Sequence, residues 1–338
     1  MNDMTTLEVA LQEEFPFLRN IFVALTRYVW SVPVCFGIPG NILTIIVANR
    51  KHNRRVSPCI YMTAMAVVDT IFLLDLLWFY SIFNTGQLDG ITTKATRGIM
   101  ARVHGYMILT CSSLSGLFLS GMSVDRFVAV RFPMAAKGLC TPRRAKLTIS
   151  AMILLMVINV HLFFVYKYVE YPSSGVRMLL YDVPIEIEKT ASLFSVLVGT
   201  VCPFTIILGS NLGIIITLWK ASINRRKLKA TAGANQEEGK ETGHLTVMLM
   251  FVSLAYVVTT LPFRVFDPIM ELPELAAIYD MTQQYWQLRF GIGTFALANI
   301  WFFNYAVNFY LYCIFGGRRY RNDAKEVLHS ILWCRKSK

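Results

Sequence analysis

The residues of this chain that could do chemistry are acids and bases embedded in apolar sequence. Asp69 and Asp75 interrupt an apolar run over 57–83, and Asp125 stands beside Arg126 in the stretch "SGMSVDRFVAVRFP". The five histidines are scattered, and no two are four residues apart as in the helical zinc motif of metalloproteases. We therefore expect no enzyme and no catalytic residue.

These groups must be positioned by helices in a membrane. The chain is 55% hydrophobic and only 16% charged, with a mean hydropathy of +0.48. Such a composition has too few charges to coat a soluble globule. A charge at a helix centre costs about 2.5 to 3.5 kcal/mol on insertion, so runs free of charge mark membrane spans. Six runs contain no Asp, Glu, Lys or Arg, at 28–49, 103–124, 147–166, 190–219, 245–263 and 290–317.

The run over 57–83 makes a seventh span, with the two acids inside it. The expected fold class is an all-α membrane protein, a seven-transmembrane helix bundle with the N-terminus outside. The expected division is an extracellular segment at 1–22, a transmembrane domain at 23–317 and a cytoplasmic amphipathic helix and tail at 318–338. The spans are expected at about 23–49, 57–83, 98–130, 146–167, 190–219, 244–268 and 288–315.

The orientation follows from the basic residues, because short cytoplasmic loops are enriched in Lys and Arg. The segments on one side of the predicted spans hold 22 of the 33 Lys and Arg residues. This side is therefore cytoplasmic and includes the C-terminal tail. The net charge of +12 is a topology signal, and we expect no nucleic-acid partner. The acidic N-terminal residues show no signal peptide, so the first span should act as its own insertion signal.

The tail predicts a short helix lying on the inner leaflet. Apolar residues recur at helical spacing among the bases, at Tyr320, Val327, Leu328, Ile331 and Leu332. Cys334 beside them is a candidate for palmitoylation. A plain basic tail is the alternative.

Several motifs in chain order resemble those of rhodopsin-like G-protein-coupled receptors. "DRF" followed by "AVRFP" resembles the Asp-Arg-Tyr signature at the end of the third span, with Phe127 in the place of the tyrosine. The other matches are Asn41 in "GNILTIIVAN", Asp69 in "AMAVVDT", Pro203 in the fifth span, Pro262 in "TTLPF", and Asn308 and Tyr312 in "NFYLY".

The resemblance implies roles for two groups of residues. Asp69 would bind an allosteric sodium ion with Ser115, Asn304 and Asn308; a protonated, hydrogen-bonded carboxyl is the alternative, and no other cofactor is expected. Arg126 would pair with Asp125 at rest and turn toward a heterotrimeric G protein when the sixth helix moves outward. Pro203 and Pro262 would bend their helices, and Tyr312 would reach inward. The alternative, which does not depend on the resemblance, is that Arg126 simply extends from the end of its helix to the membrane interface.

The chain also departs from the family pattern. Thr260 stands where the sixth-helix tryptophan is expected, Phe309 replaces the proline of the seventh-helix motif, and Asn211 replaces the fifth-helix tyrosine. Ala101 occupies the place of the third-helix cysteine that usually ties down the second outer loop, and that loop has no cysteine either. No outer disulfide is expected, because all cysteines lie in spans or on the cytoplasmic side, at Cys35, Cys59, Cys111, Cys140, Cys202, Cys313 and Cys334.

The ligand class narrows by elimination. Ile108 stands where amine receptors carry an Asp, and the seventh span has no Lys for retinal. Arg264, two residues past Pro262, is expected to face an outer cavity; pairing with Asp267 or reaching the interface is the alternative. Residues expected to line the same cavity by helical spacing are Asp75, Trp78, Phe79, Ile108 and Ser112.

Phrases such as "INVHLFF", "TTLPF" and "NFYLYC" resemble invertebrate neuropeptide receptors of the FMRFamide and thyrotropin-releasing-hormone receptor type. The resemblance implies a multi-pass receptor of the plasma membrane, with an extracellular peptide and a heterotrimeric G protein as partners. A receptor of the same fold for a lipid or another small molecule is the alternative. A transporter or channel is a remote one, since no repeated halves are apparent.

Overall fold

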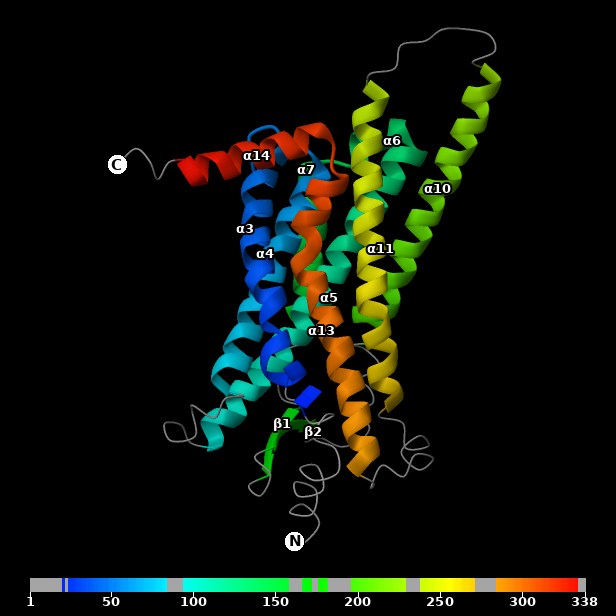
Figure 1. Cartoon of the computed structure of the whole chain (residues 1–338). Helices are drawn as coiled ribbons and strands as arrows, with labels where there is room; N and C mark the ends of the chain where they lie inside the picture. The colour runs from blue at the N-terminus through cyan, green and yellow to red at the C-terminus, as the bar shows by residue number, and fades with distance from the viewer. Residues whose placement is uncertain are drawn as a thin grey trace.

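The protein is an elongated bundle of helices with a two-stranded hairpin at one end (Figure 1). The computed structural model describes residues 20–21, 24–83, 94–157, 166–171, 176–181, 196–228, 238–270 and 284–333. The expected class of fold, a seven-helix membrane bundle, is confirmed. The main helices are α3 (Ser31–Ala48), α4 (Ser57–Trp78), α5 (Lys94–Arg131), α6 (Pro133–Leu139), α7 (Pro142–Val157), α10 (Cys202–Leu228), α11 (Glu238–Met270), α13 (Gln284–Phe315) and α14 (Arg318–Trp333).

Short elements extend or connect these helices. Wider π-helical turns lie at η1 (Leu25–Val29), η3 (Phe79–Phe83) and η5 (Leu197–Val201), and a 3₁₀ turn, η2 (Asn53–Arg55), joins α3 to α4. Five helical stretches are long and apolar enough to cross a bilayer, with mean hydropathies from 1.5 to 2.0. They are Ser31–Ala48, Ser57–Ser81, Gly98–Arg131, Leu197–Asn224 and Leu245–Phe266.

The remaining two spans are carried by α7 and α13. The described part of α7 is 16 residues long, and residues 158–165 of the expected fourth span lie outside the described residues. The predicted end of this span at 167 is wrong, because residues 166–167 begin strand β1. α13 has 32 residues and packs against α3, α4 and α11. Large apolar side chains such as Phe36, Leu212 and Trp219 are 58% or more exposed on the outside of the bundle, where a bilayer would cover them.

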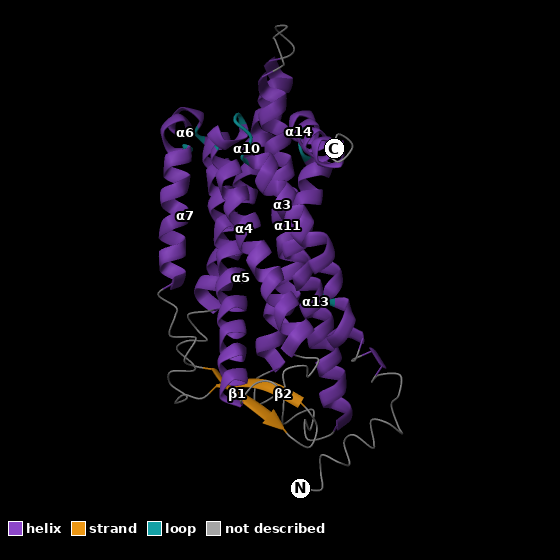
Figure 2. Cartoon of the chain, turned by 90° about the vertical axis from the view of Figure 1, so that its left-hand side faces the viewer, coloured by secondary structure: helices purple, strands orange, loops and turns teal. Residues whose placement is uncertain are grey.

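The outer loop between α7 and α10 contains β-structure that the all-α prediction missed. β1 (Tyr166–Tyr171) pairs antiparallel with β2 (Val176–Tyr181), with Tyr166 opposite Tyr181 and Tyr171 opposite Val176. Figure 2 shows this hairpin at the end of the bundle opposite α6 and α14. The strands satisfy each other's backbone groups, and β1 contacts α5. The described part of this loop thus packs on α5 without a disulfide.

The C-terminal helix α14 lies across the cytoplasmic end of the bundle (Figure 1). Its Ala324 and Val327 are buried against Val47 and Phe309. Arg50 at the end of the first span donates to Asp323 at 2.9 Å and to Glu326 at 2.6 Å. Asn53 also donates to Asp323, at 2.8 Å. The helix is therefore docked on protein, while Leu328 and Ile331 remain exposed and face away from that contact.

Close helix packing in the outer half of the bundle depends on Gly37 of α3. A Cβ added there would overlap the Leu73 side chain and would lie 2.8 Å from Cβ of Ala306. Such overlap forces the helices apart, because Cβ of Ala306 is bonded directly to the backbone of α13 and cannot rotate away. Gly37 therefore lets α3, α4 and α13 meet.

We expect Gly37→Ala to destabilise the protein by about 1 to 3 kcal/mol, because overpacking displaces two neighbouring helices. The measurement is the thermal unfolding midpoint of the purified protein in detergent. Gly138→Ala in α6 is the matched control, since a Cβ at Gly138 meets nothing within 4 Å. Equal midpoints for the two variants would contradict the packing argument.

Candidate functional site

Asp69 is the centre of a polar layer in the middle of the bundle. Its side chain is fully buried, with 0% exposure. Ser115 Oγ of α5 donates to Asp69 Oδ1 at 2.7 Å, and Asn308 Nδ2 of α13 donates to Oδ2 at 2.9 Å. One carboxyl group thus joins α4, α5 and α13, and both of its oxygens accept hydrogen bonds.

Two further asparagines lie near this layer without contacting Asp69. Asn304 is buried one turn before Asn308 but makes no hydrogen bond to Asp69 within the described ranges. Asn41 Nδ2 donates to the carbonyl oxygen of Tyr305 at 3.0 Å. Its Oδ1 is buried and finds no hydrogen-bond partner among the described residues. The layer therefore contains an amide oxygen that could accept a further donor or a cation.

Asp125 and Arg126 form a closed pair at the cytoplasmic end of α5. Arg126 Nη2 donates to Asp125 Oδ2 at 2.7 Å, and Ser57 Oγ donates to Oδ1 at 2.7 Å. Arg126 is only 7% exposed, so its guanidinium is folded over the acid and does not extend into water. Its Nε is buried with no hydrogen-bond partner in the part of the chain described. The pair therefore leaves hydrogen-bonding capacity on Arg126 unused.

Cys140, just after α6, also contacts this pair. Its Sγ lies 3.3 Å from the carbonyl oxygen of Asp125. Burial, together with the negative charge of Asp125, raises the pKa of the Cys140 thiol to about 11. The thiol therefore stays protonated at physiological pH and can donate its S–H to that carbonyl.

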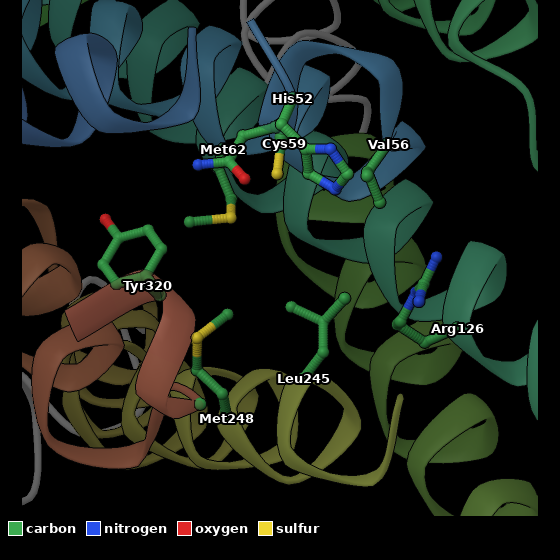
Figure 3. A pocket seen from close by; sticks show the side chains of 10 residues that line it. His52, Val56, Cys59, Met62, Arg126, Leu245, Met248 and Tyr320 are labelled. Atoms are coloured by element: carbon green, nitrogen blue, oxygen red, sulfur yellow. The ribbon is translucent and has the colours of Figure 1, made fainter. Parts of the chain in front are cut away.

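A cavity of about 290 Å³ opens beside Arg126 (Figure 3). In Figure 3, Met62 and Cys59 of α4 face Leu245 and Met248 of α11 across it, and Arg126 stands at one end. The full lining is His52, Asn53, Val56, Cys59, Met62, Arg126, Leu245, Met248, Gly317 and Tyr320. Its walls are contributed by helices from both ends of the chain, so any movement of α11 changes its width.

Tyr312 lies close to this cavity and is fully buried. Its ring meets that of Tyr320 edge-on, with centroids 5.9 Å apart. Its hydroxyl is buried without a hydrogen-bond partner among the described residues. An unpaired buried hydroxyl costs roughly 1 to 3 kcal/mol, so a conformation that pairs Tyr312 would gain that amount.

The other expected switch residues occupy distinct environments. Pro203 is buried at the second position of α10, directly after the wide turn η5. Pro262 lies inside α11 and is exposed, whereas Thr260 is buried with 2% exposure. Phe309 continues α13 without a break and packs against α14, and Asn211 is half-buried on α10.

In the outer half of the bundle the structure brings Arg264 and Ser112 together. Arg264 Nη2 donates to Ser112 Oγ at 2.7 Å, and its guanidinium carbon lies 5.0 Å from the ring centre of Trp301. Arg264 thus turns inward across the bundle. Asp267 belongs to α11, but its side chain is not among those that the structure describes. Ile108, one turn from Ser112, and Trp78 are half-buried.

Asp75, expected in the same cavity, instead pairs with His104 of α5. His104 Nδ1 lies 2.7 Å from Asp75 Oδ2, and the two side chains are 6% and 8% exposed. Phe79 stacks on the imidazole with centroids 3.5 Å apart and an interplanar angle of 3°. The pair ties the outer ends of α4 and α5 together. It lies one turn further into the bundle than Ala101, which is fully buried where a cysteine was expected.

Sequence reasoning missed His104 and Trp301. His104 could have been found, because an acid inside the second span needs a partner. His104 lies four residues before Ile108 and eight before Ser112, so it shares their helix face. Trp301 precedes Asn308 by seven residues and so shares its helix face. The six described cysteines are free, and Cys334 lies outside the described residues.

Comparison with known proteins identifies relatives of this chain. Residues 40–290 match the family described as "7 transmembrane receptor (rhodopsin family)". The growth hormone secretagogue receptor type 1 of Rattus norvegicus is 28% identical over 238 residues, which cover 68% of this chain and 62% of that receptor. The FMRFamide receptor of Drosophila melanogaster is 25% identical over 240 residues, covering 67% of this chain and 42% of that receptor. The human motilin receptor is 26% identical over 140 residues, or 40% of this chain and 32% of that receptor.

We expect His104→Ala to lower the thermal unfolding midpoint strongly, because it leaves the Asp75 carboxyl buried and unpaired, a loss of about 3 to 5 kcal/mol. The double variant Asp75→Leu, His104→Phe should recover part of the loss, since it removes both polar groups together. His52→Ala is the control, because His52 is exposed at the cytoplasmic side. A double variant less stable than His104→Ala would show that the pair is not the source of the effect.

Proposed function

The chain belongs to the rhodopsin family of seven-transmembrane receptors, and from this premise we propose that it is a plasma-membrane receptor that binds an extracellular peptide and activates heterotrimeric G proteins. The family match and the apolar helices make the chain a multi-pass membrane protein of this receptor family. The matched stretch spans 62% of the length of the rat relative.

The closed pair at Arg126 carries the proposal. Asp125 and Ser57 hold the guanidinium at the edge of the cytoplasmic cavity, and Leu245 and Met248 of α11 form the opposite wall. If α11 moves outward, the cavity widens and Arg126 can exchange Asp125 for a partner outside the membrane. A G protein that binds only the open arrangement and a ligand that favours it would then strengthen each other's binding.

A peptide ligand is supported by the relatives and by the outer half of the bundle. The Drosophila relative is a receptor for FMRFamide, whose name spells out a short amidated peptide. In this chain Arg264 and Ser112 place a cation and a hydroxyl between α5, α11 and α13, where a peptide could find polar partners.

A lipid or other small ligand is the second candidate. The observation that favours it is the buried Ala101 in place of the third-helix cysteine, because receptors for lysophospholipids also lack that cysteine. The same activation step at Arg126 would serve either ligand.

We expect nucleotide exchange on G proteins in membranes carrying this protein to depend on Arg126. Arg126→Ala should abolish exchange stimulated by a panel of amidated peptides that includes FMRFamide. Asp125→Asn should raise basal exchange, since it weakens the charged hydrogen bond that retains Arg126. Arg143→Ala, an exposed base on α7, is the matched control. Exchange that is indifferent to Arg126→Ala would refute the receptor mechanism, whereas Arg126-dependent basal exchange with no peptide response would favour the lipid ligand.

We also propose that Asp69 binds an allosteric sodium ion. Hard cations prefer oxygen ligands such as the Asp69 carboxyl, the Ser115 hydroxyl and the Asn41 amide oxygen, which has no partner among the described residues. Asn308 and Asn304 lie on the adjacent turns of α13. Ser115 and Asn308 would reorient from donating to the carboxyl to accommodating the ion.

Sodium binding should stabilise the folded receptor, by about 1.4 kcal/mol at a concentration ten times the dissociation constant. We expect the thermal unfolding midpoint to rise when NaCl replaces choline chloride at constant ionic strength. Asp69→Asn should remove this rise, while Asp75→Asn should keep it despite its own lower midpoint. A sodium effect that survives Asp69→Asn would place the ion elsewhere.

A further inference from the structure

We propose that Trp301 of α13 is the residue that transmits a ligand's contact at Arg264 to the polar layer around Asp69, so that the two side chains form a clamp that holds the receptor at rest. The proposal rests on the proposed receptor function and names the part of the outer site that responds to the ligand.

Trp301 lies at the centre of an aromatic cluster between α4, α11 and α13. It is 3% exposed and stacks on Phe263 with centroids 4.7 Å apart and an interplanar angle of 10°. Phe72 and Tyr305 meet it edge-on at 5.6 Å and 5.8 Å. Movement of this one indole would therefore disturb three helices.

A small residue, Thr260, occupies the sixth-helix position where a tryptophan was expected. Thr260 lies three residues before Phe263 on α11 and is buried with its hydroxyl unpartnered in the described part of the chain. Phe263 and Arg264, in contrast, both contact the indole from this helix. The tryptophan at the junction of α11 and α13 thus belongs to α13.

Arg264 holds the indole by charge and not by a hydrogen bond. Its guanidinium carbon lies 5.0 Å from the Trp301 ring centre, within the range of a cation–π contact. The indole N–H is buried and has no hydrogen-bond partner among the described residues. Arg264 itself donates to Ser112, and its Nε has no hydrogen-bond partner among the side chains that the structure describes. A ligand group that competes for the guanidinium would therefore loosen the indole directly.

α13 connects Trp301 to the rest of the switch as one rigid rod. The helix runs from Gln284 to Phe315 without a proline, since Phe309 stands where one was expected. Asn308 and Tyr312 follow Trp301 by seven and eleven residues, which brings each within about 20° of the same helix face. Asn308 donates to Asp69, and Tyr312 lies beside the cytoplasmic cavity. A rotation of α13 begun at Trp301 would therefore shift both.

A second contact reaches Asp69 through α4. Phe72 lies three residues after Asp69 and stacks on Tyr305 at 3.8 Å with an interplanar angle of 24°. Tyr305 in turn accepts the Asn41 amide through its carbonyl oxygen. The aromatic cluster and the polar layer therefore share the same turns of α4 and α13.

The first test is a double-mutant cycle on basal nucleotide exchange, corrected for the amount of receptor. Arg264→Gln and Trp301→Leu should each raise basal exchange about fivefold, the scale of a typical allosteric coupling, and the double variant should match the larger single effect. Arg264→Lys should raise basal exchange less than Arg264→Gln does, because it keeps a cation over the ring. Arg102→Gln is the matched control, because Arg102 is also a half-buried arginine but lies on the outer part of α5. Additive effects, or no rise in either single variant, would overturn the clamp.

The second test does not depend on a G protein. In receptor labelled with 5-fluorotryptophan, the Trp301 signal in the ¹⁹F NMR spectrum is the one missing from Trp301→Phe, out of six tryptophans in the chain. Arg264→Gln should shift this signal and leave the other five in place. An unshifted signal would overturn the clamp, as would an Asp267→Asn variant that reproduces the shift, because Arg264 would then be held by Asp267. If exchange fails altogether while the signal shifts, the clamp stands and the G-protein function falls.

Discussion

The cost of leaving a charge unpaired in a bilayer is the constraint on which this protein's internal order depends. Asp69, Asp75 and Arg126 each have a partner from another helix or an adjacent residue. Asp69 has Ser115 and Asn308, Asp75 has His104, and Arg126 has Asp125. Because water is absent there, such contacts also hold helices together: Asp69 and Asp75 are paired across helices, and Ser57 of α4 donates to Asp125. The polar contacts are therefore the main connections of a bundle whose outside is apolar.

These connections occur at three depths, and each depth allows a different kind of change. At the outer end the Asp75–His104 pair and the stacked Phe79 join α4 to α5 where no cysteine is available. In the middle the Asp69 layer joins α3, α4, α5 and α13 through direct hydrogen bonds or shared turns. At the cytoplasmic end Arg126 retains, beside a cavity, a buried Nε with no partner in the described part of the chain. Unused capacity at Arg126 and Tyr312 is what a second conformation could exploit.

The departures from the family pattern are related to one another in space. Thr260 is small, Trp301 fills the junction from the opposite helix, and Phe309 keeps that helix continuous. A helix without a proline moves as a unit, so the residues on one of its faces are mechanically coupled. Phe309 also packs on α14, which Arg50 and Asn53 hold at the end of the bundle. The same helix therefore contacts the outer site, the polar layer and the C-terminal helix.

The sequence by itself determined the class of fold, the family and the sites where charge enters the membrane. Runs free of charge located the spans because insertion penalises every exception, and Asp69, Arg126, Asn308 and Tyr312 stood at motif positions readable without coordinates. Only the tertiary structure decided the partners. Asp75 pairs with His104 and Arg264 crosses to Ser112 and Trp301, and the hairpin over 166–181 pairs across a loop. Helical spacing fixes which residues share one face, but the rotation and depth of one helix against another come from packing, and partners on different helices depend on both.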